Sequence, residues 1–236
     1  MCWSQNAIAL NDRWGLGASR KGPVVAVFGA SGVGGADTGQ YGAHTVSTAL
    51  APGITSRKNG VAQTDFTGVV GLEAGLAWRL SLAGRTGITV VSRAVNTTTC
   101  ALWVSTHFAT IVADMSGLGL VPSVCVYLTA ALDCATLAAA QGFYSDLRQL
   151  QVKIDNAWPG CGFVLFGPNT TAPTDLAIPE ATEVSRAHAS DRTGQRQFLA
   201  TSGVALQADL THPTAAGYDE LGLRAANAIL QGGCLG

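Results

Sequence analysis

One stretch near the N-terminus constrains the fold most strongly, the run Val24-Val25-Ala26-Val27-Phe28-Gly29-Ala30-Ser31-Gly32-Val33-Gly34-Gly35. Five apolar, mostly β-branched residues predict a buried strand, and the glycines that follow at once predict a tight turn. Glycine supplies the positive φ angles and the close backbone approach that such a turn needs. Ser31 lies in this turn, at the carboxyl end of the expected strand, where open α/β sheets bind their ligands.

The rest of the chain predicts strands that alternate with helices. Strands are expected at residues 24–28, 88–91, 123–128, 163–166 and 203–207, and helices at 69–83, 101–114, 136–156, 179–190 and 214–230. Residues 36–68 have a loop-like composition. This alternation predicts the α/β class, a three-layer α/β/α sandwich of flavodoxin-like type with a central parallel sheet of about five strands. We expect an irregular N-terminal arm over residues 1–22 and a single domain over residues 23–236.

The amino-acid composition argues against several classes of binding partner. Charged residues make up only 12% of the 236 residues, and the formal net charge is −1, so we expect no nucleic-acid partner. No apolar run approaches the roughly 18 residues of a membrane span, and we expect no membrane partner. Residues 1–22 lack the pattern of a secretory signal, which leaves the compartment undetermined. Six cysteines include no Cys-x-x-Cys pair, so no metal site is expected.

A second constellation lies near the C-terminus, in the sequence Asp209-Leu210-Thr211-His212-Pro213 before the last expected helix. The spacing of three residues allows a carboxylate and an imidazole to converge within one turn. A serine hydroxyl is a poor nucleophile unless a base accepts its proton and a third group orients that base. The sequence therefore predicts a catalytic triad of Ser31, His212 and Asp209, provided that the two segments meet at one edge of the sheet.

These residues carry a family resemblance. The block Asp209-x-x-His212-Pro213, followed by Ala215-Ala216-Gly217-Tyr218, resembles the last block of the GDSL/SGNH hydrolases, whose nucleophilic serine lies in a glycine-flanked turn after the first strand. The chain is most similar to the sialate O-acetylesterase-like carbohydrate esterases of that superfamily. The resemblance spans about residues 24–230 and implies an SGNH-hydrolase-like domain. It also implies a serine esterase that removes acyl groups, chiefly acetyl, from an acylated glycan without metal or organic cofactor.

The same resemblance points to an oxyanion hole. It implies that the backbone N–H of Ser31 and groups at Asn96 and Thr97 bind the oxyanion. In a third block, Leu132 stands where the family has an asparagine, and leucine cannot donate a hydrogen bond. Removing one oxyanion donor costs roughly 10²–10³ in rate. An alternative hypothesis is therefore a catalytically weakened module with a structural or glycan-binding role, for example on a virion or particle surface. In either case, the N-terminal arm is a candidate contact for a homo-oligomer or assembly.

Another interpretation of the first turn concerns a nucleotide cofactor. The spacing Gly29-x-x-Gly32-x-x-Gly35 resembles the fingerprint of the short-chain dehydrogenases, which is a weak signal by itself. The chain has no Tyr-x-x-x-Lys pair, and only the Arg57-Lys58 dipeptide could meet a cofactor phosphate. The remaining polar residues are not interpreted as catalytic. The histidines His44, His107 and His188 are interpreted as structural or surface residues, Asp133 as a helix cap or loop anchor, and Glu73 as a loop-fixing carboxylate.

Overall fold

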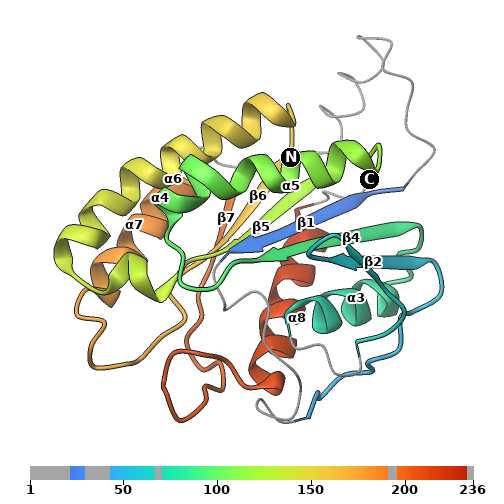
Figure 1. Ribbon diagram of the computed structural model, residues 1–236. Helices are drawn as coiled ribbons and strands as arrows, with labels where there is room; N and C mark the ends of the chain where they lie inside the picture. Colours follow the sequence, from blue (N-terminus) through green and yellow to red (C-terminus); the bar gives the residue numbers. More distant parts are fainter. Residues whose placement is uncertain (1–21, 30–42, 67–70, 191–195, 233–236) are drawn as a thin grey trace.

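The computed structural model describes residues 22–29, 43–66, 71–190 and 196–232 (Figure 1). Two expectations fall outside these ranges. Of the N-terminal arm expected over residues 1–22, only residue 22 is described. The glycine-rich turn with Ser31 lies outside the described residues. The geometry below therefore concerns the sheet, its helices and the C-terminal constellation.

The described residues form a seven-stranded sheet in the order β3-β2-β4-β1-β5-β6-β7. The strands are β1 (Val24–Gly29), β2 (Ile54–Lys58), β3 (Val61–Gln63), β4 (Ile88–Ala94), β5 (Val124–Leu128), β6 (Gly162–Phe166) and β7 (Arg196–Leu199). All neighbouring strands run parallel except β2 and β3. Because β1 lies centrally between β4 and β5, its last residue Gly29 is opposite Ala94 and Leu128, and the three strands end together.

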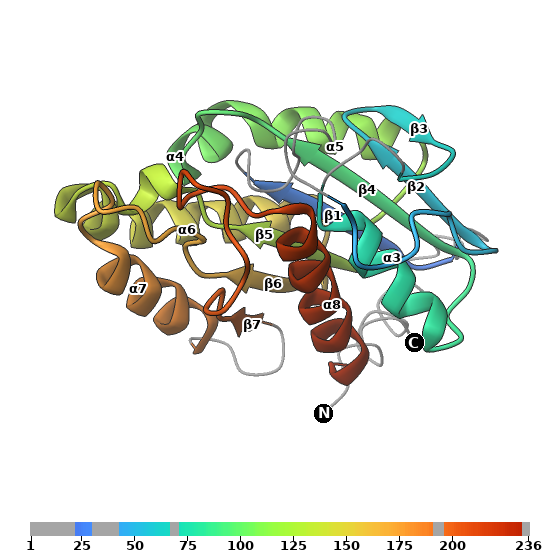
Figure 2. The ribbon, with the colours of Figure 1, turned by 90° about the horizontal axis from the view of Figure 1, so that it is seen from below.

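Helices cover both faces of this sheet, which confirms the three-layer prediction (Figures 1 and 2). One core lies between the sheet and the helices α3 (Glu73–Leu82) and α8 (Ala215–Gln231). The other core lies beneath α4 (Cys100–Leu102), α5 (Phe108–Gly117), α6 (Leu137–Ala157) and α7 (Ile178–Ser190). All residues of β1 are buried, and successive ones enter opposite cores, as expected for a central parallel strand.

The sequence analysis was wrong about parts of the sheet. It expected a loop over residues 36–68, yet β2 and β3 form within it, so the sheet has more strands than the five expected. The sequence of β2 is Ile-Thr-Ser-Arg-Lys, in which only the first and third residues are buried. Pairing with β3 and β4 provides its backbone hydrogen bonds, and this stabilisation leaves no apolar pattern in the sequence.

Two further boundaries differ from expectation. The strand expected at residues 203–207 is absent, and Leu206 forms only an isolated bridge with Pro213, while β7 precedes that segment. The helix expected over 101–114 is divided into α4, a π-helical turn (Trp103–His107) and α5. Within the described ranges, no helix is both long enough and apolar enough to cross a bilayer.

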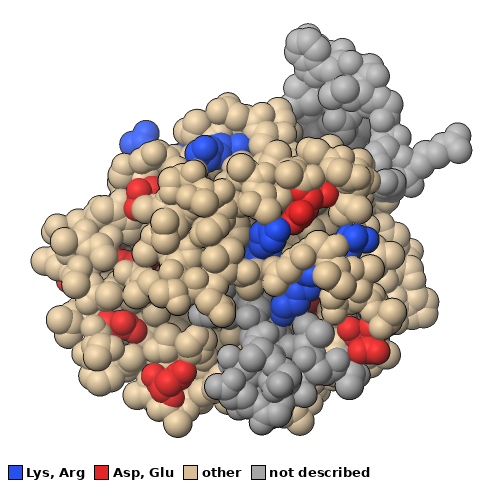
Figure 3. All heavy atoms as spheres, in the orientation of Figure 1, with Lys and Arg blue, Asp and Glu red and all other residues tan. Residues whose placement is uncertain are grey.

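Charged side chains are sparse on the surface. In the view of Figure 3, lysine, arginine, aspartate and glutamate are separated by wide areas of uncharged surface. Groups of both signs are visible on this face. One ion pair of the described residues joins Arg93 and Asp114 at 3.3 Å. The described part of this face therefore carries no large patch of a single sign.

Candidate active site

The C-terminal constellation lies on a loop, residues 205–214, whose two ends are bonded to each other. Thr214 N donates to Ala205 O at 2.9 Å, and Gln207 N donates to His212 O at 2.8 Å. The hydroxyl of Thr214 then caps α8 by accepting from Gly217 N at 3.1 Å. The loop is therefore closed at its base and continuous with a capped helix, and Asp209 and His212 lie at its tip.

Asp209 and His212 form the contact that the sequence predicts. Asp209 Oδ2 lies 2.7 Å from His212 Nδ1, while Oδ1 accepts from the backbone N–H of His212 at 2.9 Å. A further backbone N–H, that of Thr211, donates to Oδ1 at 3.0 Å. The carboxylate thus fixes both the backbone of the turn and the orientation of the imidazole. Because Nδ1 faces Asp209, Nε2 is the ring nitrogen directed away from it.

The same contacts set the charge of Asp209. Burial by itself would raise the pKa of this carboxyl, but the hydrogen bonds from His212 and Thr211 and the neighbouring imidazole outweigh burial and lower the pKa. About half of the Asp209 side chain and a third of the His212 side chain are exposed. Asp209 is therefore ionised at neutral pH beside an imidazole that solvent can reach.

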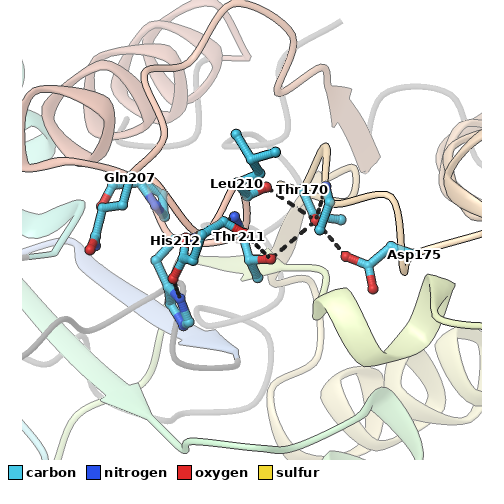
Figure 4. Close-up of polar contacts among 9 residues, drawn as sticks. Thr170, Asp175, Gln207, Leu210, Thr211 and His212 are labelled. Carbon is cyan, nitrogen blue, oxygen red and sulfur yellow. Dashed lines mark hydrogen bonds and ion pairs between the residues drawn. The ribbon is translucent and has the colours of Figure 1, made fainter.

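A second loop supports the tip of this one. Leu210 has a φ of 58°, a left-handed conformation that costs a non-glycine residue about 1–2 kcal/mol. Its carbonyl accepts from Thr171 N at 2.8 Å, and the hydroxyl of Thr170 lies 3.4 Å from that of Thr211. Figure 4 shows Thr170 beside Leu210 and Thr211, with the side chains of Leu210 and His212 on opposite sides of the loop. The supporting residues follow β6, so the tip lies at the edge where the parallel strands end.

The predicted oxyanion residues lie at the same edge. Asn96 and Thr97 form an exposed turn after β4, and Thr97 has a φ of 51°. Val95 N donates to Gly29 O at 3.2 Å, which joins this turn to the end of β1. Leu132, the residue that departs from the family pattern, is 42% exposed after β5. The segments that follow β1, β4, β5 and β6 therefore begin at one edge of the sheet.

Ser31 follows the end of β1 by two residues and lies outside the described part of the chain. Its role as nucleophile and the oxyanion role of its N–H remain predictions. The structure brings together two members of the predicted triad, Asp209 and His212. It also fixes the strand end from which the segment with Ser31 departs.

Asp133 anchors the chain near this edge, as the sequence analysis predicted. Its two carboxylate oxygens lie 3.0 Å and 3.2 Å from the N–H of Cys100, the first residue of α4. Burial raises the pKa of Asp133 to about 7, although hydrogen bonds from Cys100 and Ala130 act in the opposite direction. The start of α4, four residues after Asn96, is therefore attached to the segment that follows β5.

Glu73 fixes strands rather than a loop. Its buried carboxylate accepts a short hydrogen bond from Ser92 on β4 and lies 3.6 Å from Lys58 on β2. Arg57, the other residue of the basic dipeptide, donates to Gly60 O at 2.8 Å. The dinucleotide interpretation needs Arg57 or Lys58 to bind a cofactor phosphate, and in the structure both side chains contact other groups of the protein.

Sequence analysis missed a second histidine–carboxylate pair. His44 Nδ1 lies 2.7 Å from Asp219 Oδ1, and the other oxygen of Asp219 accepts from Thr45 N at 2.6 Å and Thr45 Oγ1 at 3.0 Å. Asp219 is fully buried on α8, and this pair attaches residues 44–45 to that helix. The separation of 175 residues left no local signal, and of the two roles expected for His44, structural or surface, the structure shows the structural one.

Other expectations concern metals and cysteines. Among the described residues, no three His, Cys, Asp or Glu side chains are grouped so that they could hold a metal ion. The four cysteines within the described ranges are buried and free, and Cys125 and Cys161 approach to 3.5 Å between their sulfurs.

Several solved structures share the fold of this chain at low sequence identity. Similar solved structures include a protein from Arabidopsis thaliana, with a TM-score of 0.69, 13% identity and coverage of 89% of this chain and 98% of that one. A carbohydrate acetylesterase family member from Sinorhizobium meliloti has a TM-score of 0.60 and 14% identity, and the match covers 89% of this chain and 99% of that one. The acetylxylan esterase Axe2 from Geobacillus stearothermophilus has a TM-score of 0.57 and 15% identity, and the match covers 91% of this chain and 96% of that one. No protein-family model and no curated protein sequence matches the chain. The chain has the fold of the SGNH/GDSL-like acetylesterases.

Proposed function

We propose that this protein is a serine esterase that removes acetyl groups from a carbohydrate through Ser31, His212 and Asp209. The observation that carries the proposal is the 2.7 Å contact between Asp209 and His212 Nδ1 at the carboxyl edge of the sheet. Its support is the fold, which solved acetylesterases share. The sparse surface charge is compatible with a neutral substrate.

In the proposed reaction, His212 Nε2 accepts the proton of the Ser31 hydroxyl as Ser31 Oγ attacks the ester carbonyl. Asp209 holds the imidazole in the required tautomer and stabilises the imidazolium that forms. The carbonyl oxygen becomes an oxyanion, for which the N–H of Ser31 and donors at Asn96 and Thr97 are the proposed ligands. The imidazolium then protonates the leaving alkoxide, and the sugar alcohol departs.

The acetyl group now bound to Ser31 is removed by water. His212 accepts a proton from the attacking water molecule, and the second tetrahedral intermediate collapses to acetic acid as the imidazolium returns that proton to the departing Ser31 oxygen. The acetic acid then ionises to acetate in solvent. Asp209 is a carboxylate through the whole neutral range because its pKa lies below its ordinary value. It can therefore stabilise the imidazolium in both halves of the reaction.

The test compares Ser31→Ala with a matched serine variant, Ser190→Ala, at the exposed end of α7. Acetate release is measured with p-nitrophenyl acetate and with an acetylated xylo-oligosaccharide. Ser31→Ala should lower kcat/KM by about 10³-fold or more, because the covalent route needs this hydroxyl, while Ser190→Ala should match the parent. Equal rates in the parent and Ser31→Ala would overturn the proposed nucleophile.

A fluorophosphonate probe distinguishes the esterase from the weakened module that the sequence analysis left open. An activated serine is phosphonylated by the probe with loss of fluoride, and peptide mass spectrometry locates the adduct. We expect labelling at Ser31 in the parent and none at that position in His212→Asn. A parent protein that neither labels nor releases acetate would favour the structural or glycan-binding role.

A further inference from the structure

We propose that Thr170 is a positioning residue for His212, acting through the tip of the 205–214 loop; this inference rests on the proposed function. Thr170 follows β6 and is only 4% exposed, so its hydroxyl is directed into the protein rather than at substrate. Figure 4 shows it between Asp175 on one side and the segment of Leu210 and Thr211 on the other.

The hydroxyl of Thr170 has one proton to donate, and the distances indicate where it goes. Asp175 Oδ2 lies 2.5 Å from Thr170 Oγ1, whereas Leu210 O lies 3.3 Å away. A carboxylate is also the stronger acceptor, so the proton is directed to Asp175. The lone pairs of Oγ1 are then available to accept from Ala172 N at 3.1 Å. The Thr211 hydroxyl lies 3.4 Å from Oγ1 and donates to Asp209 O at 3.3 Å.

These contacts determine the shape of the supporting loop. The bond from Ala172 N closes a local turn around Thr170, and within that turn Thr171 presents its N–H to Leu210 O at 2.8 Å. Leu210 has the positive φ at the tip and lies between Asp209 and His212 in sequence. The Thr170 hydroxyl therefore stabilises the support that holds the strained residue of the catalytic turn.

The need for such a support follows from the geometry of proton transfer. His212 can serve Ser31 only if its Nε2 lies within hydrogen-bond distance of the hydroxyl, and errors of about 1 Å can cost 10²-fold in rate. The hydrogen bonds at the base of the loop involve residues 205, 207, 212, 213 and 214. At the tip, Leu210 N donates to Gln207 O at 2.9 Å and Thr211 N donates to Asp209 Oδ1 at 3.0 Å. The carbonyl of Leu210 has its partner outside the 205–214 loop, in Thr171 N of the loop after β6.

The experiment compares Thr170→Val, which keeps the shape and removes the hydroxyl, with Thr170→Ser, which keeps the hydroxyl. The matched control is Thr182→Val, which removes a hydroxyl bonded to Ile178 O within α7. We expect Thr170→Val to lower kcat on p-nitrophenyl acetate by about 10- to 100-fold with little change in KM. Thr170→Ser should recover most of the parent rate, and Thr182→Val should retain it.

A second measurement is independent of activity. Proton NMR at low temperature detects the downfield resonance of a proton held between His212 Nδ1 and Asp209, and His212→Asn assigns it. We expect Thr170→Val to broaden or abolish this resonance through faster exchange, and Thr170→Ser to retain it. If Thr170→Val does not fold, as judged by circular dichroism, Asp175→Ala removes the acceptor from a half-buried site and should shift both readouts in the same direction.

The outcomes separate this inference from the proposed function. A folded Thr170→Val or Asp175→Ala protein with the parent kcat and the parent His212 resonance would overturn the positioning role. Equal losses in Thr170→Val and Thr170→Ser would also overturn it, because the hydroxyl would then be irrelevant. A parent protein without esterase activity would contradict the proposed function, while the NMR comparison would still decide the role of Thr170.

Discussion

Two histidine–aspartate pairs with the same 2.7 Å separation have different surroundings in this protein. Asp219 is fully buried and saturated by His44 and Thr45, so it can meet no substrate. Asp209 is about half exposed at the tip of a loop and holds an imidazole that solvent can reach. The residue pair alone therefore does not indicate catalysis, whereas its burial and position in the sheet distinguish a structural pair from a candidate catalytic pair.

This difference predicts opposite effects for the two matched amide variants. Asp209→Asn should lower kcat by roughly 10²–10⁴-fold, because the amide can stabilise the wrong tautomer of His212 and cannot balance an imidazolium. Its free energy of unfolding should change little at this exposed site. Asp219→Asn should instead lower the free energy of unfolding by about 1–3 kcal/mol, since it impairs a buried hydrogen-bonded pair.

Both variants are measured by p-nitrophenyl acetate hydrolysis and by urea unfolding at pH 7. The two proteins can be compared directly, because each variant replaces a single carboxylate by an amide and leaves both histidines in place. If Asp209→Asn loses stability and keeps its rate, Asp209 is a structural residue of the turn and has no part in orienting His212.

At the scale of elements, α3 and α8 pack at close range because glycines lie where they meet. A Cβ built on Gly222 of α8 would lie 2.2 Å from Leu72 O, and one on Gly75 of α3 would lie 2.1 Å from Asp219 O. Backbone atoms cannot move aside as a side-chain end can. The glycines therefore permit the approach that sets the position of α8, and α8 begins directly after the 205–214 loop.

Gly222→Ala should consequently destabilise the protein, by about 1–3 kcal/mol or more, because the helices must separate. The matched control is Gly142→Ala on α6, where a Cβ would meet nothing within 4 Å. That substitution should stabilise the protein by about 0.5–1 kcal/mol, since alanine is the better helix former. Urea unfolding of both variants is the measurement, and equal stability of the two would show that α3 and α8 can separate without cost.

At the scale of the whole molecule, stability should depend on the proton that Asp133 binds. Burial raises its pKa from the ordinary 3.8 to about 7 in the folded protein. Between about pH 4 and pH 7 the folded state therefore holds a proton that the unfolded chain has released. The free energy of unfolding falls as the pH rises through this window, and the loss is complete above about pH 7.

Asp133→Asn resembles the protonated form and lacks this dependence. Relative to the parent, its free energy of unfolding should rise between about pH 4.5 and pH 8, by on the order of 2–4 kcal/mol. Urea unfolding at several pH values measures the difference between the two proteins. A constant difference across this range would mean that Asp133 has the same affinity for its proton in the folded and unfolded states.

Much of the fold could be predicted because its signals are local. β1 is buried on both faces and is therefore a continuous apolar run, and the amphipathic helices α6 and α8 show one apolar stripe each. Strand β2 could not be found in this way, since its five residues are mostly polar and pairing with β3 and β4 makes it a strand. Strand β7 is the outermost strand next to β6, and its four residues are half-buried and form no apolar run.

The sequence by itself determined the layered α/β architecture and the pairing of Asp209 with His212, because both depend on neighbours within a few residues. Only the tertiary structure decided that the loop after β6 supports Leu210, that Asp133 anchors α4, and that His44 pairs with Asp219. These contacts join residues between 33 and 175 positions apart. No local pattern encodes such pairs, since they exist only once the sheet has aligned the ends of its strands and α8 has packed on its face.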